Sequence, residues 1–213
     1  MSAADDRPMN AGPTNAGPIY VGALPRLHSG REAPVWWGVA GLVVIAAMVA
    51  ASFLASYFYL RLYHAVWPPA GVAPPDLLWP GVDLLLLLSS GVALWLAGRA
   101  LGREHGGWFV FGMFVSAILA ALVLLSRWRQ YEVFGFRWDS HPYGSIVWTV
   151  LGFHGVLVMT AVVWIAAVAL LGLRGYITPR RRIAFSIAAL YGYFVGLVWI
   201  PLYLVLYWAP RWL

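Results

Sequence analysis

The chain has 213 residues, of which 62% are hydrophobic and 10% are charged, and its mean hydropathy is +0.76. So little polar surface cannot coat a water-soluble globule, and the absence of cysteine excludes disulfides and thiolate metal sites. The net charge of +6 does not indicate nucleic acid, because in membrane proteins it reflects basic loops held against anionic headgroups.

Residues 1–34 are predicted to form a flexible cytoplasmic tail. They contain Asp5, Asp6 and Glu32, several prolines and glycines, and a near-repeat of Asn-Ala-Gly-Pro at 10–13 and 15–18. They have no apolar core of the length of a signal peptide. Such a segment buries too little apolar area to offset its backbone entropy.

Five apolar runs follow, each long enough to cross a bilayer. They cover approximately 35–60, 79–96, 107–126, 143–173 and 183–208. About 20 residues, at a rise of about 1.5 Å per residue, cross a hydrocarbon core of roughly 30 Å. The sequence therefore predicts an all-α fold in which residues 35–213 form a transmembrane bundle of five spans.

The arginines predict the orientation of this bundle. With the N-terminus in the cytoplasm, nine arginines fall in inside segments and five in outside segments, which agrees with the positive-inside rule. The topology is therefore expected to be N-in and C-out. The inside arginines predicted to meet lipid headgroups are Arg99, Arg174, Arg180, Arg181 and Arg182.

The links between the spans differ in kind. The short link 102–106 predicts that the second and third spans form an antiparallel hairpin. Small residues three or four apart in the third span, beginning at Gly112 and Ser116, predict a face that another helix approaches closely. Residues 127–142 mix charged and aromatic side chains and are expected to be an outer loop packed on protein or at the interface.

Asp83 is the carboxylate placed within a span. One interpretation makes it a proton carrier, because ionisable groups in membranes are rare and functional. The favoured interpretation places it in the first turn of its helix, either capping the positive end of the helix dipole or pairing at a helix interface.

His154 lies near the middle of the fourth span. It could act as a metal ligand or a proton shuttle, but no second histidine within the membrane could share a metal. The favoured interpretation is a neutral imidazole hydrogen-bonded to another helix. Tyr193 is a candidate for contact across helices or with lipid, and Ser89 and Ser90 for bonds back to their own helix. No set of residues amounts to an active site.

Several segments resemble subunit III of the haem-copper cytochrome c oxidases. Residues 55–61, Ala-Ser-Tyr-Phe-Tyr-Leu-Arg, resemble the end of a span in that family, and 84–90 its leucine run and serine pair. The stretch containing Tyr143, Ser145 and His154 is similar to the family's Tyr-Gly-Ser followed by Gly-Phe-His-Gly. Residues 198–208 are similar to its C-terminal helix, and five spans match its shorter bacterial form.

The chain also departs from the family pattern. The family's intramembrane glutamate would fall near Ala46, and its second histidine at Val156 or Leu157. Its Trp-His-Phe-Val-Asp reads Gly-Tyr-Phe-Val-Gly at 192–196. A proton or oxygen role that depends on those groups does not carry over.

The resemblance implies a helix bundle without its own cofactors, docked beside subunit I in a complex with subunit II. Haem and copper would lie in those partner subunits, which reduce oxygen to water and move protons in a bacterial plasma membrane. The resemblance also implies that phospholipids bind. The residues expected to be structural or to lie at helix interfaces are Asp83, Ser89, Ser90, Tyr143, Ser145, His154 and Tyr193. A cytochrome c donor or a larger respiratory supercomplex is a further partner that the resemblance implies. The alternatives are a related subunit of a nitric oxide reductase and a small membrane transporter.

Overall fold

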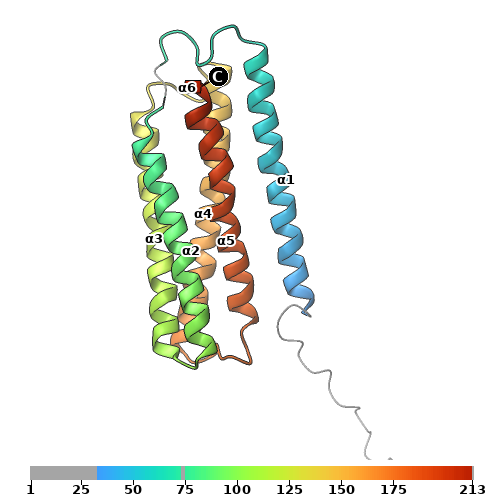
Figure 1. Cartoon of the computed structure of the whole chain (residues 1–213), viewed down its shortest axis with the longest axis vertical. Helices are drawn as coiled ribbons and strands as arrows, with labels where there is room; N and C mark the ends of the chain where they lie inside the picture. Colours follow the sequence, from blue (N-terminus) through green and yellow to red (C-terminus); the bar gives the residue numbers. More distant parts are fainter. Residues whose placement is uncertain (1–32, 73–74, 213) are drawn as a thin grey trace, which may run out of the picture.

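A computed structural model describes residues 33–72 and 75–212 (Figure 1). Its helices are α1 (Pro34–Leu62), α2 (Leu78–Gly102), α3 (Gly106–Val133), α4 (Pro142–Leu173) and α5 (Ile183–Tyr203). The π-helical turn η1 (Leu204–Trp208) and the short α6 (Ala209–Trp212) continue α5 without a break. Within these ranges the only β pairing is an isolated bridge between Thr178 and Arg181.

The predicted all-α bundle of five spans is confirmed. Five helices, with α5 counted through to Trp212, are long and apolar enough to cross a membrane, so this is a multi-pass membrane protein. Pro34 and Pro142 each occupy a first helical position. Proline is favourable there because a backbone N–H at that position would have no acceptor within the helix. All but the last two residues of the predicted tail, and hence its flexibility, lie outside the described ranges.

The helices run up and down, and four of them form the core. Helix α2 packs on α3 and α5, and α4 packs on α3 and α5, whereas α1 lies to one side against α4 and α5 (Figure 1). The expected hairpin of the second and third spans is confirmed in α2 and α3. In α1 only Val39, Ala46, Ala50 and Tyr57 are buried.

Small residues allow the core helices to approach closely. A Cβ added at Gly112 of α3 would lie 3.0 Å from the Cβ of Ala97 in α2, so the predicted small-residue face is confirmed. At Gly192 of α5 an added Cβ would lie 2.7 Å from Cδ1 of Leu94, which is fully buried. The glycine at 192 thus makes room for a leucine of α2.

The structure corrects two element boundaries. Residues 127–133, expected in an outer loop, form the last two turns of α3. Helix α2 begins one residue before the expected span and continues six residues beyond it, to Gly102. In α3 the added turns carry Arg127 and Gln130, whose polar side chains have partners at Asp83 of α2.

Charge separates the two ends of the bundle. The end that carries the links 103–105 and 174–182 is here called the basic end, and among the described residues it has six arginines and one carboxylate, Glu104. Its arginines are Arg99, Arg103, Arg174, Arg180, Arg181 and Arg182, all of them exposed. The opposite end carries the links 63–77 and 134–141, together with α6 (Figure 1).

Candidate functional site

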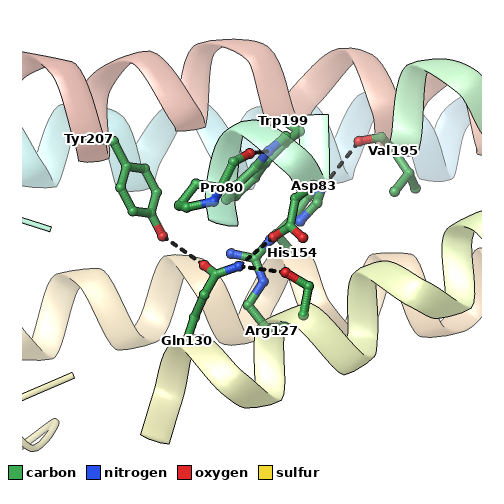
Figure 2. A network of polar contacts seen from close by, with 9 residues as sticks. Pro80, Asp83, Arg127, Gln130, His154, Val195, Trp199 and Tyr207 are labelled. Atoms are coloured by element: carbon green, nitrogen blue, oxygen red, sulfur yellow. Dashed lines mark hydrogen bonds and ion pairs between the residues drawn. The ribbon is translucent and has the colours of Figure 1, made fainter. Parts of the chain in front are cut away.

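A buried ion pair joins α2 to α3 in the half of the bundle opposite the basic end. Nη2 of Arg127 lies 3.2 Å from Oδ2 of Asp83, and the two side chains are 4% and 0% exposed. Gln130 lies almost one turn further along α3, on the same face of that helix as Arg127. Its Nε2 donates a hydrogen bond of 2.7 Å to the same Asp83 oxygen (Figure 2).

Two aromatic residues of the last span complete the contacts of this pair. The hydroxyl of Tyr207, in η1, donates to Oε1 of Gln130 at 3.2 Å. The ring of Trp199 lies 4.2 Å from the Arg127 guanidinium carbon, and its Nε1 donates to the Pro80 carbonyl of α2 at 3.3 Å. The cation is therefore held by a carboxylate on one helix and an aromatic ring on another.

His154 brings α4 into the same group of residues. Its side chain is fully buried, and its Nε2 lies 3.2 Å from the carbonyl oxygen of Val195 on α5, to which it donates (Figure 2). Its ring also stacks on Trp199, with the ring centres 4.5 Å apart. We call Asp83, Arg127, Gln130, His154, Trp199 and Tyr207 the polar cluster.

The chemistry open to the polar cluster is limited. Its two charges neutralise each other, and it has no nucleophile beside a base. Among the described residues no group of three His, Cys, Asp or Glu side chains could hold a metal ion. Asp83 Oδ1, Arg127 Nε and Nη1, and His154 Nδ1 have no hydrogen-bond partner in that part of the chain. The contacts of the cluster join α2, α3, α4 and the last span at one level of the bundle.

The expectation that Asp83 caps its helix is wrong. Helix α2 begins at Leu78, five residues before Asp83, and no acidic side chain lies in its first turn or caps it. The carboxylate instead has the contacts of the other favoured alternative, a partner at a helix interface. His154 likewise has the interhelical hydrogen bond that the sequence predicts, while its role stays a prediction.

The serine pair divides between two environments. Ser90 is buried, and its Oγ lies 2.8 Å from Oγ of Ser116 and donates to the Ser116 carbonyl at 3.1 Å. The expected bond of Ser90 back to its own helix is therefore replaced by a contact from α2 to α3. Ser89 is exposed on the surface of α2.

The remaining predicted interface residues lie apart from the polar cluster. Tyr143 is fully buried at the start of α4, with its ring centre 5.1 Å from that of Trp67. Ser145 is exposed and donates to the Trp138 carbonyl at 2.7 Å, which ties the link 134–141 to α4. Tyr193 is half-buried with its ring against Gly91 of α2.

Sequence reasoning missed Arg127, Gln130, Trp199 and Tyr207. A usable signal was present, because Asp83 and Arg127 have opposite charges and fall near the same end of two spans predicted to form a hairpin. The spacing of Arg127 and Gln130 also suits one helix face. Trp199 and Tyr207 carry no signal of this kind, since aromatic residues are frequent throughout the chain.

Comparisons with known proteins agree on one family. The family model described as cytochrome c oxidase subunit III matches residues 32–211. Cytochrome c oxidase subunit 3 of Marchantia polymorpha is 28% identical over 179 residues, which cover 81% of this chain and 67% of that protein. The protein of the same name from Drosophila yakuba is 27% identical over 180 residues, covering 81% and 68%. That from Equus caballus is 28% identical over 176 residues, covering 78% and 67%.

Proposed function

The chain belongs to the cytochrome c oxidase subunit III family, and on that premise we propose that it is an accessory subunit which stabilises the catalytic subunit of a haem-copper oxidase. In this proposal haem and copper lie in subunits I and II, and this chain binds phospholipid. The membrane is the bacterial plasma membrane, with the basic end in the cytoplasm. The predicted tail 1–34 lies on that side.

The polar cluster is the observation that favours the role of a stabilising accessory subunit. Its charged and hydrogen-bonding groups contact one another across α2, α3, α4 and the last span. Side chains that fix two helices relative to each other make the bundle more rigid. A rigid bundle can in turn stabilise the catalytic subunit that packs against it. The site residues are accordingly proposed to be structural, and none is proposed to be catalytic.

The proposal that this chain holds no haem or copper rests on its own donor groups. The sequence has no cysteine, and Nε2 of His154 already donates to the Val195 carbonyl. The neighbouring ring is that of Trp199, which has no metal-binding atom. The family match, described as a cytochrome c oxidase, favours the oxidase over a nitric oxide reductase or a transporter as the complex concerned.

Purification of the tagged full chain in mild detergent tests this function. We expect haem-bearing membrane subunits to co-purify, with a Soret band in the complex. After the partners are stripped away, the single chain should show neither a Soret band nor stoichiometric copper. Haem or copper on the isolated chain would overturn the cofactor-free part of the proposal, and a preparation without any haem-bearing partner would overturn the accessory role.

A further inference from the structure

A groove between α2 and α3 opens at the basic end, away from the polar cluster. It encloses about 620 Å³. Its mouth is formed by Arg99, Arg103 and His105, and no carboxylate lines it. Glu104 lies between two of these residues in the sequence but is not part of the lining. Arg99 and Arg103, the charged side chains that line the mouth, are therefore both cationic.

One of these cations is held in place. The guanidinium carbon of Arg99 lies 4.5 Å from the centre of the Trp95 ring, one turn back on α2. A guanidinium restrained by a ring loses less conformational freedom when it binds an anion. The contact with Trp95 therefore restrains the Arg99 guanidinium at the mouth of the groove.

The first turn of α3 adds backbone donors at the same mouth, because His105 and Trp108 both line it. The first N–H with an i−4 partner in this turn belongs to Phe109, which donates to the His105 carbonyl at 3.0 Å. The N–H groups of Gly107 and Trp108 come before it and have no helix carbonyl to bond. A Cβ added at Gly107 would meet nothing within 4 Å, so the turn is open to a ligand. Arginines beside the N-terminal amides of a helix suit a phosphate group.

The rest of the groove is apolar and runs along the helices. Away from the mouth it is lined by Ala93, Leu96, Phe111, Gly112 and Val115. From Arg103 to Ala93 is ten residues of α2, or about 15 Å at the helical rise. That length is about half of a hydrocarbon core of roughly 30 Å, which corresponds to one leaflet. An acyl chain would fill such an apolar groove, whereas a free phosphate would occupy only its mouth.

We infer that this groove is a binding site for one anionic phospholipid, with its phosphate at Arg99, Arg103 and the first turn of α3 and an acyl chain along Leu96 and Phe111. The inference rests on the proposed function only in that the basic end lies at the headgroup level of a membrane. It assigns a specific site on the outer surface of the α2–α3 hairpin, rather than a general affinity of exposed arginines for lipid.

Native mass spectrometry of the full chain in detergent, with defined lipids added, tests this inference. The probes are palmitoyl-oleoyl phosphatidylglycerol and the matching phosphatidylcholine. The wild type should retain one phosphatidylglycerol at least about tenfold better than phosphatidylcholine, as expected when charged hydrogen bonds recognise the headgroup. The double variant Arg99→Gln/Arg103→Gln should lose that preference.

The matched control is Arg180→Gln/Arg181→Gln, which removes the same charge from the same end but outside the groove. It should keep the preference. Leu96→Trp, at a position 52% exposed in the groove, should lower retention of both lipids by filling the path of the acyl chain. Circular dichroism establishes that each variant is folded.

Three results would overturn the inference. The first is an equal loss of the preference for phosphatidylglycerol in the two double arginine variants. The second is a wild type that binds phosphatidylglycerol and phosphatidylcholine equally well. The third is displacement of phosphatidylglycerol by soluble glycerol 3-phosphate at a similar concentration. The last would assign the mouth to a free phosphate ester. None of them depends on co-purification of haem-bearing subunits, so failure of the lipid site and failure of the accessory role are separate outcomes.

Discussion

At the scale of single residues, the pair of Asp83 and Arg127 is where substitution should matter most. Burying two charges is costly, and the cost is recovered only through close geometry and further hydrogen bonds. Gln130 supplies such a bond to Asp83, and Trp199 lies against the cation. Removing one partner leaves the other charge buried without compensation, whereas removing both leaves an apolar contact.

Arg127→Leu is therefore predicted to destabilise the bundle by about 3–5 kcal/mol. The double variant Asp83→Leu/Arg127→Leu should be closer to the wild type than either single variant, as a double-mutant cycle measures. The readout is unfolding of the full chain in mixed micelles. The control Arg129→Leu removes a charge two residues away that is 74% exposed, and it should change stability little. Similar effects at positions 127 and 129 would contradict a buried pair.

His154 is predicted to act through its hydrogen bond to α5. His154→Gln keeps a donor and should leave assembly largely intact, whereas His154→Leu should loosen the bundle by about 0.6–2 kcal/mol, as for interhelical hydrogen bonds in membranes. Turnover per haem in the assembled oxidase should change little in either variant, measured beside subunit retention on a native gel. Severe loss of turnover in both variants with normal assembly would instead assign His154 to proton transfer.

His154 and Arg127 show how much of the polar cluster could be predicted from the sequence. His154 stands alone among apolar neighbours, so its need for a partner on another helix was predictable, although Val195 was not. Arg127 follows directly after an apolar run that ends at Ser126, a pattern typical of a loop at the membrane surface. Its burial in α3 depends on the Asp83 carboxylate, 44 positions earlier in the chain, and on the Trp199 ring, which together compensate its charge.

At the scale of helices, composition predicted the number and approximate position of the spans because each had to be about 20 apolar residues long. The ends were less predictable, since α3 continues through Arg127 and Gln130 to Val133. Pro201 lies inside α5, which continues to Tyr203 and then widens into the π-helical turn η1. That turn carries Tyr207, the last span's hydrogen-bond donor to Gln130.

The close approach of α2 and α3 depends on Gly112. Gly112→Leu is predicted to push the two helices apart and to destabilise the bundle by about 1–3 kcal/mol, because the new side chain would meet Ala97 and the Ala93 carbonyl. The control is Gly155→Leu in α4, where an added Cβ has nothing within 4 Å. Unfolding in mixed micelles compares the two. A larger loss at position 155 than at 112 would contradict the packing assigned to this hairpin.

At the scale of the whole molecule, charge and topology agree. Five antiparallel spans bring the links 103–105 and 174–182 to one end, and that end has six arginines against one carboxylate among the described residues. The opposite end has five arginines, one of them buried in the polar cluster, and four carboxylates. The bias of basic residues toward the cytoplasm therefore favours the orientation proposed here.

The absence of cysteine from the sequence provides a direct test of this orientation. Single cysteines placed at Arg180, at the basic end, and at Asp139, at the opposite end, replace exposed side chains. In intact cells a membrane-impermeant maleimide should label Asp139→Cys and leave Arg180→Cys unlabelled. After permeabilisation both should react, which controls for buried thiols, and the cysteine-free chain should stay unlabelled throughout. Labelling of Arg180→Cys alone in intact cells would invert the topology. It would also move the arginine-lined mouth of the lipid groove from the cytoplasmic leaflet to the outer one.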